Sequence, residues 1–378
     1  MRPLRMLTAG ALSVGTVLAG VGVVQADDAP PPDAPPPVAA ATSNFTLPLF
    51  GTPLLIDVTT DAGGGLLEIA LNPSDAYTAT KVKPNHVGFV NTDGTVKVRV
   101  SAKHGGERIS LRAGEPTDLT GPGSWSGDVF GTGQTTTVDF TTGIAGDGGP
   151  DITLVTVSSA VESTVGATEY STHEDDDDDD GHESEQSASA TVTFTEAGQT
   201  RTLKIRFTVE TEDGVTRSSL KIGLSRIRGQ QIADGPAVGP HTWSGMLCAG
   251  PATVTYTVAD DGTISDVVPS PDASVSNGEH GVSVEFSRGE RIRISVKGDA
   301  PDLVVGVSSK IRCDKTDPKV NTTVDPAADD HHDGDDDHDG DHDEDHDSDH
   351  DEDHDKSHGE DHDKSHDDRG DSHDGDHD

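Results

Sequence analysis

The chain has 378 residues, a formal net charge of −42 at pH 7, 31% hydrophobic residues and 3% aromatic residues. So acidic a surface repels nucleic acids and anionic membranes, which argues against either as a partner, and it attracts cations. The few aromatic residues and the 43 glycines indicate small cores of Val, Ile and Leu, built from many short strands joined by turns.

The first 26 residues have the layout of a cleaved secretory signal. Arg2 and Arg5 precede an uncharged apolar stretch, residues 7–24, and Ala26 is the small residue at the expected cleavage point. A short membrane anchor is the alternative for this stretch. With cleavage, we expect a secreted protein, in the cell envelope or outside it, with no membrane contact. Residues 27–42 then form a Pro/Ala-rich linker.

A short motif occurs twice and contains the two tryptophans of the chain. Residues 121–127 read GPGSWSG, and residues 239–245 read GPHTWSG. A matching isoleucine, Ile109 or Ile227, lies sixteen residues before each tryptophan, in a strand-like run. We interpret Trp125 and Trp243 as core residues at turns, because the chain has few aromatics to fill its cores. An exposed Trp surface that stacks on sugars or aromatic ligands is the alternative.

A second pattern, a strand, a glycine-containing turn and another strand, occurs three times, at residues 87–100, 192–207 and 282–296. In each second strand, apolar and basic residues alternate, which predicts one face on a core and one face in water. The basic pairs in these strands are Lys97 and Arg99, Lys204 and Arg206, and Arg291 and Arg293. We expect cross-strand ion pairs with acids such as Glu285. The alternative is a cationic stripe that binds an anionic polymer or the tail of the chain itself.

These repeats predict an all-β fold of tandem antiparallel, immunoglobulin-like β-sandwich repeats with disordered acidic termini. The expected units are residues 43–127, residues 128–245 with an acidic insertion at 173–185, residues 246–317, and a disordered tail at 318–378. The two cysteines, Cys248 and Cys313, are expected to form a disulfide that joins the first and last strands of the third unit.

The sequence contains none of the common catalytic patterns: no H-E-x-x-H motif, no phosphate-binding loop and no Cys–His nucleophile context. Ser126 and Ser244 do not lie in a G-x-S-x-G elbow. We therefore expect a protein that is not an enzyme.

The most specific chemical pattern lies in residues 325–378, which hold 27 acidic and 3 basic residues and 12 of the 18 histidines. Eight of these histidines recur at every fourth position, mostly with Asp on both sides. Neutral imidazole is a good ligand for Zn²⁺, Ni²⁺ and Cu²⁺, and carboxylates add oxygen ligands. The expected metal ligands are His331, His332, His338, His342, His346, His350, His354, His358, His362, His366, His373 and His377.

In composition, this tail resembles the His/Asp-rich segments of bacterial zinc-binding proteins and nickel chaperones, and the resemblance implies metal buffering. A separate acidic run, from Asp175 to Asp180, is a candidate Ca²⁺ site. The expected function is therefore an exported, non-enzymatic protein that binds or buffers divalent transition metals through its tail. The alternative is a structural or adhesive surface protein that binds a cell-envelope polymer or protein, with a tail that only solvates it.

Overall fold

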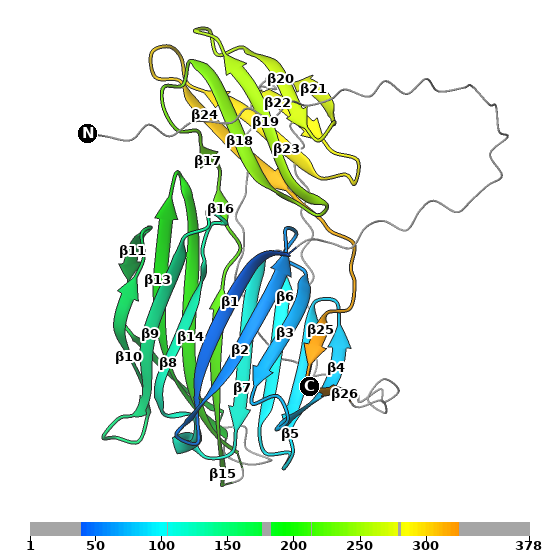
Figure 1. Ribbon diagram of the computed structural model, residues 1–378. Helices are drawn as coiled ribbons and strands as arrows, with labels where there is room; N and C mark the ends of the chain where they lie inside the picture. The colour runs from blue at the N-terminus through cyan, green and yellow to red at the C-terminus, as the bar shows by residue number, and fades with distance from the viewer. Residues whose placement is uncertain (1–38, 104, 176–182, 213, 279–280, 325–378) are drawn as a thin grey trace, which may run out of the picture. The chain divides into compact units, whose positions relative to one another are not determined.

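The computed structural model describes residues 39–103, 105–175, 183–212, 214–278 and 281–324 (Figure 1). These residues are mostly β-strand, with one short 3-10 helix, η1 (Pro116–Leu119), and no α-helix among them. The all-β prediction is confirmed. No helix in these ranges is long and apolar enough to cross a membrane.

Two large sheets pack face to face around one core, and we call this part the larger sandwich. Its seven-stranded sheet has the order β10-β9-β8-β1-β2-β3-β25. The bounds of these strands are β1 (Ala39–Leu49), β2 (Thr52–Asp61), β3 (Leu66–Asn72), β8 (Gly121–Asp128), β9 (Thr135–Ile144), β10 (Pro150–Ser158) and β25 (Lys319–Asn321).

The facing sheet has eleven strands in the order β11-β13-β14-β15-β7-β6-β5-β4-β26, with β12 paired to β13 and β16 paired to β14. All neighbours in it are antiparallel except β26, which runs parallel to β4. The bounds are β4 (Tyr77–Lys83), β5 (His86–Asn91), β6 (Lys97–Lys103), β7 (Gly106–Ala113), β11 (Glu162–Val165), β12 (Glu169–Asp175), β13 (Glu183–Glu196), β14 (Gln199–Glu212), β15 (Val215–Leu224), β16 (Arg228–Gly229) and β26 (Thr323–Val324).

Alternation of apolar and polar residues along the strands explains why the two sheets pack face to face. In β14, Leu203, Ile205 and Phe207 are fully buried, whereas Lys204 on the other face is exposed. Because successive side chains point to opposite faces, such a strand places one row in the core and one row in water. The core joins both sheets: the rings of Trp125 in β8 and Phe194 in β13 have centroids 6.3 Å apart.

A smaller sandwich has its own core, formed by Trp243, Val254, Val284, Ile292 and other buried residues. Its three-stranded sheet has the order β18-β19-β20, and its five-stranded sheet has the order β17-β24-β23-β22-β21. The bounds are β17 (Gln231–Ile232), β18 (Gly239–Leu247), β19 (Gly250–Val258), β20 (Ile264–Ser270), β21 (Ser274–Gly278), β22 (Gly281–Glu285), β23 (Arg291–Lys297) and β24 (Val304–Lys310).

The predicted unit boundaries differ from these bodies. The boundary at 127/128 lies inside β8, before its last residue, and β8 pairs with β9 along its length. The first two predicted units share both large sheets and one core. The boundary at 245/246 lies inside β18, so the second Trp motif belongs to the smaller sandwich. Residues 39–42 of the predicted linker lie in β1, and the first residues of the predicted tail form β25 and β26. A short repeat in sequence does not show which strands close a shared core.

The three predicted hairpins are confirmed. They are β5–β6, β13–β14 and β22–β23, each antiparallel. The prediction for Ile227 is wrong: this residue lies between β15 and β16, outside any strand, and is 38% exposed, whereas Ile109 is buried in β7. Ile109 and Ile227 have the same spacing to their tryptophans, but Ile227 lies in a loop and is not a core residue.

Candidate functional site

The predicted transition-metal ligands, the twelve histidines between His331 and His377, all lie outside the described residues. Within the described ranges, no three His, Cys, Asp or Glu side chains are grouped so that they could hold a metal ion. The metal prediction for the tail therefore stays a prediction, and it depends on the chemistry of the sequence.

The acidic run that begins at Asp175 lies between two paired strands. β12 and β13 are antiparallel neighbours, and their last described pair is Asp175 with Glu183. Residues 176–182 lie outside the described part of the chain, so the calcium prediction also stays a prediction. The structure adds that the run joins two strands of one hairpin at the sheet end.

The predicted disulfide is confirmed. Cys248 and Cys313 are bonded, with a separation of 65 residues along the chain. Cys248 directly follows β18, in the three-stranded sheet, and Cys313 follows β24, in the five-stranded sheet. The bond therefore ties the two sheets of the smaller sandwich together.

The Trp-Ser-Gly motif has a packing role. Trp125 is fully buried and Trp243 is 9% exposed, so the interpretation as core residues is confirmed. The predicted turn is wrong, because the motifs lie within β8 and β18. A Cβ on Gly127 would be 2.8 Å from Cζ2 of Trp125, and one on Gly245 would be 2.4 Å from Cζ2 of Trp243. In each copy the indole covers the glycine two positions later on the same face, which excludes a larger residue there.

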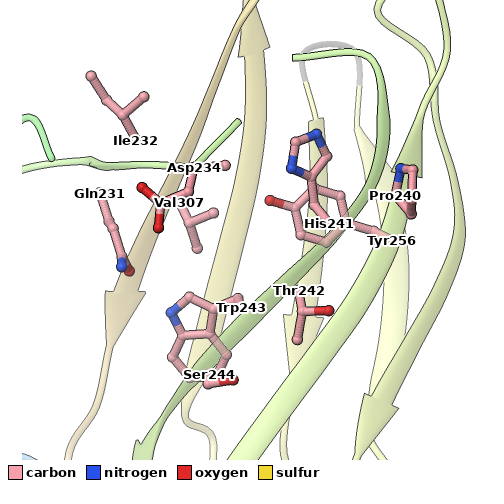
Figure 2. A pocket seen from close by; sticks show the side chains of 11 residues that line it. Gln231, Ile232, Asp234, Pro240, His241, Thr242, Trp243, Ser244, Tyr256 and Val307 are labelled. Atoms are coloured by element: carbon pink, nitrogen blue, oxygen red, sulfur yellow. The ribbon is translucent and has the colours of Figure 1, made fainter. Parts of the chain in front are cut away.

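A small pocket of about 170 Å³ lies in the smaller sandwich, beside the second Trp motif. Figure 2 shows Gln231 and Asp234 across the pocket from His241 and Tyr256, with Trp243 below them. The rings of His241 and Tyr256 are stacked, with centroids 5.3 Å apart. Burial raises the pKa of the Tyr256 hydroxyl, which keeps it neutral and able to donate a hydrogen bond.

The groups in this pocket do not form a catalytic pair. Nε2 of His241 lies 2.9 Å from the carbonyl oxygen of Ala237, and the ring is only 8% exposed. A backbone carbonyl therefore orients the imidazole, which is the arrangement of a packed histidine rather than of a general base beside a nucleophile. Sequence reasoning missed this pocket, because Gln231 and Asp234 belong to β17 and the loop after it and match no motif.

A buried polar cluster lies in the larger sandwich, around Arg201 of β14. The guanidinium group of Arg201 donates three hydrogen bonds to backbone carbonyl oxygens, those of Gly105, Val129 and Ser225, at 2.6, 2.7 and 2.7 Å. Burial lowers the pKa of Arg201, while the nearby Glu107 and Asp128 oppose the shift. Since the three acceptors belong to three different connections, Arg201 fixes the loops at this end of the sheets.

Comparisons with known proteins give no relative: no family model matches the chain, and neither a curated protein nor a solved structure matches it.

Proposed function

We propose that this protein captures divalent transition-metal ions through its tail, residues 325–378, and that the two β-sandwiches form its scaffold. The observation that carries the proposal is the regular series from His338 to His366, in which a histidine recurs at every fourth position among aspartates. Asp alone would keep a chain soluble, so a solvating role gives no reason for a regular histidine period.

The ligand chemistry supports transition metals. Imidazole nitrogen binds Zn²⁺, Ni²⁺ and Cu²⁺ well, whereas Ca²⁺ and Mg²⁺ prefer oxygen ligands. With three or four ligands per ion, twelve histidines are enough for roughly three or four ions. The surrounding carboxylates raise the local concentration of cations before any imidazole binds.

The folded part offers a firm attachment for such a tail. β25 pairs with β3 in one sheet of the larger sandwich, and β26 pairs with β4 in the other. Val324, the last residue of β26, directly precedes the tail. The scaffold therefore carries the tail on a strand that is hydrogen-bonded into a sheet, rather than on a free linker.

The proposal includes export and, for the smaller sandwich, an immunoglobulin-like architecture. A disulfide is typical of oxidising compartments, which supports the secretory signal expected in residues 1–26. Two antiparallel sheets of three and five strands, tied to each other by one disulfide, support the architecture. Acidic composition with few apolar residues supports a disordered tail.

Calorimetric titration of Zn²⁺, Ni²⁺, Cu²⁺ and Ca²⁺ into the full chain, and into a chain that ends at Val324, tests the proposal. We expect several micromolar or tighter sites for one transition metal, present only with the tail and weakened as the pH falls and the imidazoles take up protons. Binding that is weak and unselective, or that persists without the tail, contradicts it and favours a role for the β-sandwiches in binding a surface partner.

A further inference from the structure

The outward face of the eleven-stranded sheet carries a row of cations in direct register. From β4 to β14, the residues paired across the strands are Lys81, Gly88, Arg99, Ser110, Lys221 and Arg206. Neighbouring strands are about 4.8 Å apart, so Arg99 and Lys221, two strands apart, lie about 10 Å from each other along this row. Gly88 and Ser110 separate Lys81, Arg99 and Lys221, whereas Lys221 and Arg206 are direct neighbours.

The adjacent row continues the pattern. Its paired residues, again from β4 to β14, are Lys83, His86, Ser101, Arg108, Gly223 and Lys204. Lys97 of β6 lies on the same face, one row further on. We call this surface the basic face, and its members are Lys81, Lys83, Lys97, Arg99, Arg108, Lys204, Arg206 and Lys221.

Described acids are fewer than cations on this face. On the outward side of β4–β7, β14 and β15, the described acids are Glu210 and Glu212. They bind two further arginines of the same side, Arg112 at 2.7 Å and Arg217 at 3.0 Å. Within the basic face, Arg206 binds Glu185 of β13 at 2.7 Å. A concentrated positive surface on a chain with a net charge of −42 calls for a partner of opposite charge.

His86 lies within this surface and reports its potential. Burial lowers the pKa of His86 to about 4, and the positive charges of Arg99, Lys81 and Lys83 contribute to the shift. The group faces Lys83 from β4 and Ser101 from β6, its register partners. Three members of the basic face therefore disfavour the protonated form of the same side chain, as expected where cations are clustered.

The acidic tail begins beside this surface. β26 runs parallel to β4, with Val324 opposite Ala79, two positions before Lys81. The tail that follows has 27 acidic and 3 basic residues. Its 54 residues could extend over about 180 Å, whereas six neighbouring strands span about 24 Å, so its length is ample.

We propose that the basic face is the docking surface of the chain's own acidic tail, residues 325–378, held by ion pairs between the tail carboxylates and the lysines and arginines of β4–β7, β14 and β15. This inference stands independently of metal capture. An external polyanion is the less favoured occupant. Covalent attachment gives the tail a high effective concentration, and the field of the tail repels other polyanions.

The salt dependence of the overall size tests the docking on the intact chain. Small-angle scattering of the full chain in EDTA, extrapolated to zero protein concentration, gives the radius of gyration between about 10 mM and 0.3 M NaCl. Over this range the screening length falls from about 30 Å to below 10 Å. A docked tail is released by salt, so we expect the radius to rise. An undocked acidic tail repels itself at low salt, and a radius that falls steadily with salt overturns the proposal.

Two matched variants assign the effect to this surface. The face variant carries Lys81→Gln, Lys83→Gln, Arg99→Gln and Lys221→Gln. The control removes the same charge from the smaller sandwich with Arg291→Gln, Arg293→Gln, Lys297→Gln and Lys310→Gln, all at exposed positions. We expect the face variant to reverse the salt trend and the control to retain it. A face variant with the same rise as the unmodified chain overturns the proposal.

Added polyglutamate distinguishes the tail from an external occupant. A docked tail competes with it, so polyglutamate should bind the full chain about tenfold or more weakly than a chain that ends at Val324. The intensity and position of tryptophan fluorescence check that the shortened chain is folded, because both tryptophans are buried. Equal affinities would show an open face and overturn the tail as its occupant.

Discussion

Removal of the disulfide should destabilise the smaller sandwich and leave the larger one unchanged. The bond closes a loop with a sequence separation of 65 residues. In the chain-entropy model, such a loop removes about 15 cal/mol/K from the unfolded state, or about 4 kcal/mol at 25 °C. Domains are stable by about 5–15 kcal/mol, so this is a large share for a unit of this size. We choose Cys248→Ala with Cys313→Ala, because Cys248 is fully buried and a serine hydroxyl there would lack a partner.

The two tryptophans let each sandwich be followed separately. Trp243 lies in the core of the smaller sandwich and Trp125 in that of the larger one. In a Trp125→Phe background, urea unfolding followed by fluorescence should show the Trp243 midpoint lowered by about 1.5–4 M, given about 4 kcal/mol and a typical urea dependence of 1–3 kcal/mol/M. The reciprocal Trp243→Phe background should show no shift. An unchanged Trp243 midpoint, or equal shifts in both backgrounds, would refute the reasoning.

Three further predictions concern packing, buried charge and pH. Gly245→Ala places a Cβ 2.4 Å from the Trp243 ring and should lower the free energy of unfolding in urea by about 1–3 kcal/mol. Gly278→Ala, whose Cβ has no neighbour closer than 3.5 Å, should lower it much less. Equal losses would contradict the packing role of the motif. Arg201→Met leaves one buried and two partly buried carbonyls without their donor and should lower the free energy of unfolding of the larger sandwich by about 3–5 kcal/mol. The more exposed pair lost in Arg206→Met should cost at most about 1 kcal/mol, and similar losses would refute the role of Arg201. The pKa of His86 is about 4 when folded and near 6.5 when unfolded, so the unfolded state binds more protons between these values. The larger sandwich should therefore lose stability as the pH falls from 6.5 to 4. His86→Gln should flatten that slope, and an unchanged slope counts against the lowered pKa of His86.

Local patterns in the sequence predicted local structure well. The alternation in residues 96–100, 203–207 and 292–296 gave the hairpins, because each strand needs only its own period and one turn. The disulfide followed from an even cysteine count. The predicted ion pair of Glu285 is confirmed with Arg291, at 3.0 Å, since directly opposite positions in a hairpin follow from the turn.

Long-range pairing could not be read in this way. The basic face arises because β7 pairs with β15. This pairing brings Arg99 into the same row as Lys221, and Arg108 into the same row as Lys204, more than 90 positions later in the sequence. No pattern within β7 or β15 indicates that these two strands are neighbours in the sheet. For the same reason, the sequence divided residues 43–245 into two units, whereas one core joins Phe45 to Phe207. The pocket near His241 also depends on distant segments, β17, β18 and β24.

The most direct test of metal capture replaces the twelve tail histidines by asparagine and keeps every aspartate. The variant keeps every carboxylate of the tail, so a loss of tight binding comes from the missing imidazole ligands. The account predicts that calorimetric titration of Zn²⁺, Ni²⁺ and Cu²⁺ shows several tight sites in the unmodified chain and only weak, salt-sensitive binding in the variant. Equal binding by the two chains would contradict it and make the tail a polyanion whose histidines have no part in metal capture.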